Sequence, residues 1–171
     1  MRLELSKSVI RPFASTDAES ITKHWDNRNL WLNLNDGFPH PFTLEAAQRF
    51  LSDALASPQS WLAIEVDGEA VGAFHVTIQP PPKHHSASVG YWIGERYWRR
   101  GSVTEALEAV TAHFLSAHNL TRMFAYVFEG NVASMRVLEK CGYEREGWLR
   151  QGIMKNGRAI DQALYAKIAN R

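Results

Sequence analysis

The sequence predicts an α+β or mixed α/β fold, and three observations carry this prediction. Segments with the pattern of strands outnumber those with the pattern of helices, and helices interrupt the strands late in the chain. Residues 61–78 have the form of a β-hairpin. Residues 102–117 repeat apolar side chains at helical spacing. A mixed sheet with accompanying helices satisfies all three.

The chain begins with a predicted strand and a predicted helix. Residues 8–13 read as the strand, and Pro12 places them at the edge or end of a sheet because proline cannot donate a backbone hydrogen bond. Thr16 and Glu19 have the spacing of a capping box, in which each side chain bonds the other's backbone. We therefore expect a helix from Thr16 through Trp25.

A loop and a second helix follow. Residues 27–41 are rich in Asn, Trp and Pro, which predicts a short helix and a mobile loop. Thr43 can cap a helix that Ser57 and Pro58 end. The apolar face of this helix is expected to hold Leu44, Ala47, Phe50, Leu51 and Leu55.

The middle of the chain predicts three strands. Residues 61–66 and 70–78 are joined through Asp67-Gly68, a strong hairpin signal, although the turn could be longer than two residues. Residues 80–85 form a proline-rich loop, and residues 86–93 then read as a strand.

The helix predicted over residues 102–117 follows a basic turn. Ser102 and Glu105 have capping-box spacing, which would start the helix at that serine. The apolar positions that predict it are Val103, Ala106, Leu107, Val110, Phe114 and Ala117.

The last third predicts alternating strands and a helix. Residues 121–128 are apolar on both faces, as a buried strand is. A helix is expected to begin at Asn131 and end near residues 141–142. Residues 143–149 and 159–168 then read as strands, with Asn156-Gly157 a turn between them.

Composition indicates one globular domain, residues 1–171, able to bury about 70% of its unfolded surface. Hydrophobic residues make up 45% and charged residues 22%, and the formal net charge is +1. This balance argues against nucleic-acid or membrane-surface binding driven by bulk charge. One cysteine, Cys141, excludes an internal disulfide and favours the reducing cytoplasm. We expect no signal peptide and no membrane-spanning segment.

The turn before residue 102 has the features of an anion site. The first amides of a helix have no partner inside it, and the helix dipole adds about half a positive charge there. Gly101 opens the turn and Arg99 and Arg100 lie beside it, so the amides could cradle a phosphate or pyrophosphate. An ordinary capped helix with two solvated arginines explains the same pattern.

This stretch resembles the acetyl-CoA-binding motif of the GNAT superfamily of N-acetyltransferases, in particular the ribosomal-protein N-terminal (RimJ/RimL-type) group. In that family a glutamine or arginine, two variable residues, glycine, a variable residue, and glycine or alanine wrap the pyrophosphate of coenzyme A. The matching positions here are Trp98, Arg99, Arg100, Gly101, Ser102 and Val103. Only Gly101 matches strictly; tryptophan at the first position is similar to many members of the group, and valine at the last departs from the motif.

Two further blocks extend the resemblance over nearly the whole chain. Residues 131–147 look like the family's Asn-x-x-Ser helix, followed by Lys-x-Gly-aromatic and a strand. Residues 38–43 are similar to the substrate-side loop of the group. The resemblance implies a central twisted, mostly antiparallel sheet with a parallel pair at the cofactor cleft, flanked by helices.

The resemblance also implies direct acetyl transfer from acetyl-CoA, the co-substrate, to a primary amine. The amides from Arg99 to Thr104 would hold the pyrophosphate. Backbone groups near Tyr91, Trp92 and Ile93 would hold the pantetheine arm and the acetyl carbonyl. Ser134 would assist the departing thiolate by donating a hydrogen bond, unless it only bonds its own helix. Asn131 would orient the cofactor or cap the helix.

The general base is left open. Several relatives carry a glutamate where this chain has Ser88, and others where it has Ile153. Glu129 could act directly or through water, although an exposed loop glutamate is an equally ordinary interpretation. His40 and His75 have suitable intrinsic pKa values near 6.5, but histidines are more often structural.

Other chemistry is less well supported. His84 and His85 lack convincing metal-ligand spacing, so no metal is expected. Cys141 is better interpreted as a buried, inert thiol than as a nucleophile.

We therefore predict a cytoplasmic acetyl-CoA-dependent N-acetyltransferase, a monomer or homodimer without nucleic-acid or membrane partners. The expected acceptor is a protein or peptide N-terminal amine, with a small amine such as a polyamine or an antibiotic as the alternative. A CoA-binding module with little catalysis is a rival of another class, and so is a nucleotide-binding protein, although the chain lacks a P-loop pattern.

Overall fold

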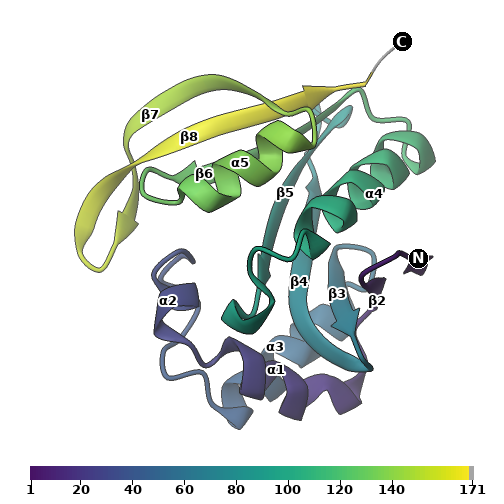
Figure 1. Ribbon diagram of the computed structural model, residues 1–171. Coiled ribbons are helices and arrows are strands. Elements are labelled where there is room, and N and C mark those ends of the chain that lie inside the picture. The colour runs from purple at the N-terminus through teal and green to yellow at the C-terminus, as the bar shows by residue number, and fades with distance from the viewer. Residues whose placement is uncertain (170–171) are drawn as a thin grey trace. The chain divides into compact units, whose positions relative to one another are not determined.

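A computed structural model describes residues 1–169, which cluster into two compact units (Figure 1). The first unit comprises Met1–Val76 and Tyr91–Ala106, and the second comprises Thr77–Gly90 and the described residues from Leu107 onward. Strands β4 (Glu69–Ile78) and β5 (Ser86–Ile93) and helix α4 (Ser102–Ala117) contribute residues to both units. Each unit is thus built from two separate segments of the chain.

Eight strands hydrogen-bond in the order β1-β2-β3-β4-β5-β6-β8-β7. Strands β5 and β6 pair in parallel, with Ser86 opposite Arg122, whereas β1–β2, β2–β3, β3–β4, β6–β8 and β7–β8 pair antiparallel. This confirms the expected mostly antiparallel sheet with one parallel pair. The remaining strands are β1 (Leu3–Glu4), β2 (Val9–Pro12), β3 (Trp61–Val66), β6 (Arg122–Phe128), β7 (Glu144–Lys155) and β8 (Arg158–Ile168).

The β3–β4 hairpin of the first unit confirms its sequence signal. Asp67 and Gly68 have φ values of 53° and 80°, so the turn has two residues and both are left-handed. Glycine adopts this conformation without a steric penalty, and a two-residue turn of this hand matches the twist of the flanking strands.

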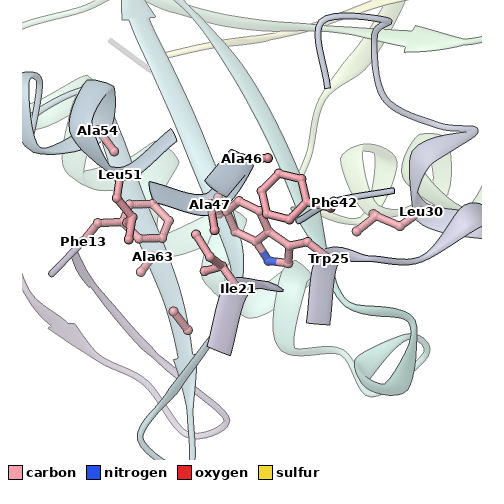
Figure 2. Close-up of a cluster of buried hydrophobic side chains, with 12 residues drawn as sticks. Phe13, Ile21, Trp25, Leu30, Phe42, Ala46, Ala47, Leu51, Ala54 and Ala63 are labelled. Atoms are coloured by element: carbon pink, nitrogen blue, oxygen red, sulfur yellow. The ribbon is translucent and has the colours of Figure 1, made fainter. Parts of the chain in front are cut away.

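The core of the first unit lies between this hairpin and helices α1 (Ala18–Trp25) and α3 (Leu44–Ala56). Figure 2 shows Trp25 beside Phe42, with Ile21 and Ala47 close to them. The Trp25 side chain is fully buried and belongs to this core. Full burial of one such aromatic side chain stabilises a fold by about 1.5–3 kcal/mol.

The start of the first helix differs from the prediction. A 3-10 turn, η1 (Ser15–Asp17), precedes α1, and the Asp17 carboxylate accepts a hydrogen bond from the Ala14 amide at 2.8 Å. Asp17 also receives two hydrogen bonds from the Arg11 guanidinium, each 2.8 Å long. The helix start is therefore organised by Asp17, not by Thr16 and Glu19, because the Asp17 carboxylate reaches both the Ala14 amide and the partly buried Arg11.

Thr43 caps α3 as expected, its hydroxyl accepting from the Ala46 amide at 3.2 Å. The predicted apolar face is partly wrong, because Leu44 and Leu55 are 45% and 43% exposed. The buried stripe consists of Ala46, Ala47, Leu51 and Ala54, with Phe50 packed beside it. The face of α3 that packs into the core thus carries three small alanines, and the two leucines near the ends of the helix are exposed. Helix α2 (Arg28–Trp31) is the short helix expected in residues 27–41.

The second unit contains the greater part of α4 and helix α5 (Val132–Lys140). Leu107, Val110 and Phe114 of α4 are buried, as the helical periodicity predicted. Strand β6 is not buried on both faces as expected, because its burial alternates and Tyr126 is 51% exposed. An aromatic ring at an outward position satisfies strand propensity without being buried.

Strands β7 and β8 form a long hairpin whose turn, Asn156-Gly157, has φ values of 50° and 72°. This confirms the predicted turn, although β7 continues to Lys155, beyond the predicted end at residue 149. Within residues 1–169, none of the helices combines the length and the hydrophobicity that crossing a membrane requires.

Candidate active site

The candidate site residues fall into two groups, one in each unit. The first group is the end of β5 and the turn that leads into α4. Here the Trp98 indole N–H donates to the Ile93 carbonyl at 2.8 Å, and the Tyr97 amide donates to the Gly94 carbonyl at 2.9 Å. Trp98, at the first position of the acetyl-CoA motif, therefore fastens the turn to the end of the strand.

The turn itself has the backbone that close contact with a phosphate needs. Arg99 and Gly101 have φ values of 61° and 79°, and the Glu105 amide donates to the Gly101 carbonyl at 3.1 Å. This hydrogen bond joins the left-handed turn to the helical ladder of α4, and the turn leads directly into the helix N-terminus. Val103 lies inside this first turn rather than in the left-handed turn, so its branched side chain is compatible with the motif. These features fit a pyrophosphate bound by backbone amides.

Two positive side chains flank the turn. Arg99 and Arg100 are exposed, and the Arg100 guanidinium lies 5.5 Å from the centre of the buried Tyr97 ring. A guanidinium in this position makes a cation–π contact. The stacked Arg100 is thus held against the protein surface.

Glu105 does not close the capping box that its spacing suggested. Helix α4 begins at Ser102 as expected, but the Glu105 carboxylate accepts from the Ser6 amide at 2.8 Å. The hydrogen bonds from Ser6 lower the pKa of Glu105. The sequence could not indicate this partner, because 99 positions separate the two residues.

Strands β4 and β5 approach each other closely beside Trp92. A Cβ on Gly72 would lie 2.4 Å from the Trp92 carbonyl oxygen and 2.9 Å from the Ile93 Cα, so only glycine fits. The Gly94 amide donates to the Val71 carbonyl at 2.8 Å. The backbone of Tyr91, Trp92 and Ile93 is therefore fixed by its neighbours.

The second group lies around the start of α5. The Asn131 side-chain oxygen accepts from the Ser134 amide at 3.1 Å, which confirms Asn131 as the N-cap of this helix. Ser134 is partly buried in the first helical turn. The structure thus brings together the asparagine and the serine of the Asn-x-x-Ser pattern.

Glu129 is an exposed residue tied to β8. Its amide donates to the Asp161 carbonyl at 3.1 Å, and its carboxylate accepts from the Asp161 amide at 3.4 Å. The Asp161 carboxylate accepts from the Gln151 amide at 2.8 Å and the Trp148 indole at 2.7 Å, and these bonds lower the pKa of Asp161. Sequence reasoning missed Asp161, because its partners depend on an irregular register between Leu149 and Ile153.

The histidine and cysteine candidates have structural surroundings. The His75 ring stacks on Trp61 with centroids 3.9 Å apart, and burial lowers the pKa of His75. His40 stacks on Trp31 at 5.5 Å. Burial raises the pKa of Cys141 to about 11, so the thiol stays protonated, as expected of an inert cysteine. Across the described part of the chain, His, Cys, Asp and Glu side chains do not gather in a set of three able to hold a metal ion.

Residues 7–144 match the family described as "Acetyltransferase (GNAT) domain". The curated relatives include the uncharacterized N-acetyltransferase YoaA of Bacillus subtilis, 31% identical over 99% of this chain and 97% of the relative. The L-amino acid N-acetyltransferase AaaT of Escherichia coli is 26% identical over 96% of this chain and 99% of the relative. The Escherichia coli ribosomal-protein-serine acetyltransferase is 31% identical over 51% of this chain and 49% of the relative.

Solved structures agree with this assignment. A GNAT-family acetyltransferase from Bacillus anthracis has a TM-score of 0.88 with 21% identity, covering 98% of both chains, which supports the fold. Mycobacterium smegmatis RimJ in complex with CoA-disulfide has a TM-score of 0.85 with 26% identity, covering 95% of this chain and 82% of RimJ. The protein is accordingly an acetyl-CoA-dependent N-acetyltransferase, and the chain belongs to the GNAT acetyltransferase family.

Proposed function

We propose that the acceptor is the α-amine at the N-terminus of a protein or peptide. The observation that carries this proposal is the nature of the residues at the two positions where relatives place a glutamate base. The residues at these two positions are Ser88 in β5 and Ile153 in β7. The Ser88 hydroxyl lies 3.5 Å from the Gln79 side-chain nitrogen. Neither side chain can take a proton from an ammonium ion.

An enzyme without a strong base favours an amine that is already partly neutral. A terminal α-amine has a pKa of roughly 7.7–8.0, whereas an alkyl amine such as lysine has a pKa of about 10.4. At pH 7.5 about a quarter of the former is neutral, compared with about 0.1% of the latter. The neutral, reactive fraction of the peptide α-amine is therefore about 200 times that of the alkyl amine. Solvent can serve as the proton acceptor for such an amine.

The relatives support two acceptors that share an α-amine. The ribosomal-protein-serine acetyltransferase is named for a protein substrate and AaaT for free L-amino acids. A free amino acid is the second candidate, because the match to AaaT spans almost the whole chain. Both differ from a polyamine or an aminoglycoside-type antibiotic in presenting an amine on a carbon that also bears a carbonyl group.

The residues of the turn are proposed to hold acetyl-CoA. Bound there, acetyl-CoA supplies an activated acetyl thioester. The amides from Arg99 to Thr104 would bind the pyrophosphate at the positive end of α4. The fixed backbone from Tyr91 to Ile93 would orient the pantetheine arm and the acetyl carbonyl.

Ser134 is proposed to donate its hydroxyl proton, or a hydrogen bond, to the sulfur as negative charge develops on it. Asn131 contributes by holding the first turn of α5, which fixes the backbone that carries Ser134. Glu129 is proposed as a proton acceptor acting through water. Its exposure and its contacts with Asp161 suit a relay to solvent better than direct contact with the amine.

A panel of acceptors tests the proposal. Initial rates would be compared for a short peptide with a free N-terminus, the same peptide with a blocked N-terminus and a free lysine, free L-amino acids, and spermidine. We expect kcat/KM to be highest for the free N-terminus. Preference for the blocked, lysine-containing peptide or for spermidine would contradict the proposal, and preference for amino acids would select the second candidate.

A further inference from the structure

Lys7, in the turn between β1 and β2, lies against the motif turn of α4. Its Nζ is 2.8 Å from the position that a Cβ on Gly101 would occupy. Lys7 is exposed and belongs to the same unit as Gly101. Its ammonium group therefore lies beside Gly101, the glycine of the acetyl-CoA-binding motif. Nothing in the motif or in the sequence spacing indicates this approach.

The backbone that carries Lys7 is held in place by α4 itself. The Ser6 amide donates to the Glu105 carboxylate at 2.8 Å, and the Leu5 amide donates to the Ser8 carbonyl at 3.0 Å. The second bond closes a tight turn around Ser6 and Lys7. Glu105 lies in the first turn of α4, one helical turn beyond Gly101. Helix α4 thus supplies the backbone amides of the motif turn, and it also holds the β1–β2 turn that carries Lys7.

The positive charges around the contact between Lys7 and Gly101 favour a bound anion. The N-terminus of a helix is the positive end of its dipole, where a cation is unfavourable and an anion is favourable. Arg99 adds a second exposed positive charge in the same turn. Glu105 offsets part of this charge: its carboxylate accepts a hydrogen bond from Ser6, and the backbone and the charge of Lys7 also lower the pKa of Glu105. A ligand carrying phosphate groups would relieve the excess positive charge.

We propose that Lys7 is a cofactor-binding residue that contacts a phosphate group of acetyl-CoA, and that Glu105 positions it. This inference rests on the proposed binding of pyrophosphate at residues 99–104. Lysine binds phosphate as a flexible point charge, whereas the turn amides bind it directionally. The two contributions are complementary, because the amides fix the phosphate and the lysine neutralises it.

Calorimetric titration with CoA and with dephospho-CoA tests the inference. Lys7→Ala should raise the Kd for CoA about 10- to 150-fold, the range expected for one charge-assisted hydrogen bond to a charged group. Lys7→Arg should retain most of the affinity, and Lys83→Ala, which changes an exposed lysine in the second unit, should retain all of it. An equal loss for both ligands would assign Lys7 to the pyrophosphate, and a loss for CoA alone would assign it to the 3′-phosphate.

Glu105→Gln separates positioning from general stability. It should weaken binding of CoA less than Lys7→Ala does, and the two changes together should weaken it no more than Lys7→Ala alone. A Kd of Lys7→Ala within twofold of the wild type, with the fold intact by circular dichroism, would overturn the inference. If Gly101→Val abolishes CoA binding while Lys7→Ala leaves it unchanged, the proposed pyrophosphate site stands and the role of Lys7 falls. If the wild type binds no CoA at millimolar concentration, both fall.

Discussion

Single residues at the start of α5 have separate tasks. Asn131 is the N-cap of this helix, and Ser134 lies in its first turn. The Asn131 side-chain oxygen accepts a hydrogen bond from the Ser134 amide, and the Ser134 hydroxyl is the group proposed to act on the sulfur. Negative charge on sulfur exists only as the thioester breaks, so a hydrogen bond to it acts mainly in the transition state. Ser134→Ala should therefore lower kcat by about 10²-fold or less and leave the Kd for acetyl-CoA nearly unchanged.

Steady-state rates and calorimetry on the same Ser134→Ala sample check this prediction. The loss should shrink for an acyl donor whose thiol leaves more easily. A variant with full kcat that is only less stable, by roughly 1 kcal/mol, would show that the hydroxyl serves the helix backbone alone.

His75 should make the stability of the protein depend on pH. Burial lowers its pKa below 6.5, so below pH 6.5 the unfolded chain binds a proton that the folded protein resists. The stability that His75 contributes is therefore complete above about pH 6.5 and decreases as the pH falls toward its folded pKa. Urea unfolding between pH 5 and pH 8 should show this decrease in the wild type and a smaller one in His75→Phe.

His84→Phe, in an exposed loop, serves as the matched control and should keep the wild-type pH dependence. If His75→Phe and the wild type lose stability in parallel between pH 6.5 and pH 5, His75 is not the group responsible.

Some side-chain contacts could be predicted from the sequence, and others could not. Asn131 was predicted correctly as a cap, because its partner is three positions away and local spacing determines the contact. The partners of Glu105 and Asp161 could not be predicted in the same way. Ser6 reaches Glu105 only after two distant segments have folded together, and Gln151 reaches Asp161 through the irregular register between β7 and β8.

At the scale of the element, α4 offers the sharpest test of packing. Phe114 is 4% exposed and lies on the face predicted from the helical repeat. Phe114→Ala should reduce the free energy of unfolding by about 3–5 kcal/mol, since it removes buried surface and leaves a cavity. Urea unfolding measures the loss.

The exposed Ser116→Ala change in the same helix is the control and should alter stability by less than about 0.5 kcal/mol. A loss below 1 kcal/mol for Phe114→Ala would mean that the site collapses to fill the cavity or that the face is not packed.

Elements with a strong local signal were predicted well, and their orientation less well. The turns Asp67-Gly68 and Asn156-Gly157 carry their conformation in two residues. The face that α3 buries depends on how closely its alanines approach the hairpin, and the apolar pattern alone favoured Leu44 and Leu55. The two-residue strand β1 was missed, because so short a segment has no periodicity to read.

At the scale of the whole molecule, we propose that residues 1–171 behave as one domain. Strands β4 and β5 and helix α4 contribute residues to both compact units. Neither unit can unfold completely without disrupting elements that the other needs. Chemical unfolding should therefore proceed in a single transition.

Two probes can follow the units separately. Five tryptophans lie in the first unit, at positions 25, 31, 61, 92 and 98, and Trp148 and the buried Cys141 lie in the second. In Trp148→Phe, fluorescence reports the first unit, and labelling of the Cys141 thiol reports the second. The two urea midpoints should coincide, and separate midpoints would show two domains that unfold independently.

The expectation of a mostly antiparallel sheet with one parallel pair came from resemblance to a family rather than from periodicity, and only the structure gives the strand order and identifies β5 and β6 as that pair. Local patterns indicate that strands exist, but pairing depends on which strands meet after collapse. The mixed fold class was predictable from the residues alone, whereas the topology was not.

The two ends of the sheet bear on whether copies of the chain aggregate. A long, flat terminal strand invites another chain to hydrogen-bond to it, as in amyloid growth. Here one terminal strand, β1, has only two residues, and the other, β7, changes register after Arg145 and again after Leu149. Gln151, with a φ of 51°, lies within the second irregularity. Both borders thus offer a poor template for edge-to-edge pairing, which protects concentrated solutions of the enzyme from fibril formation.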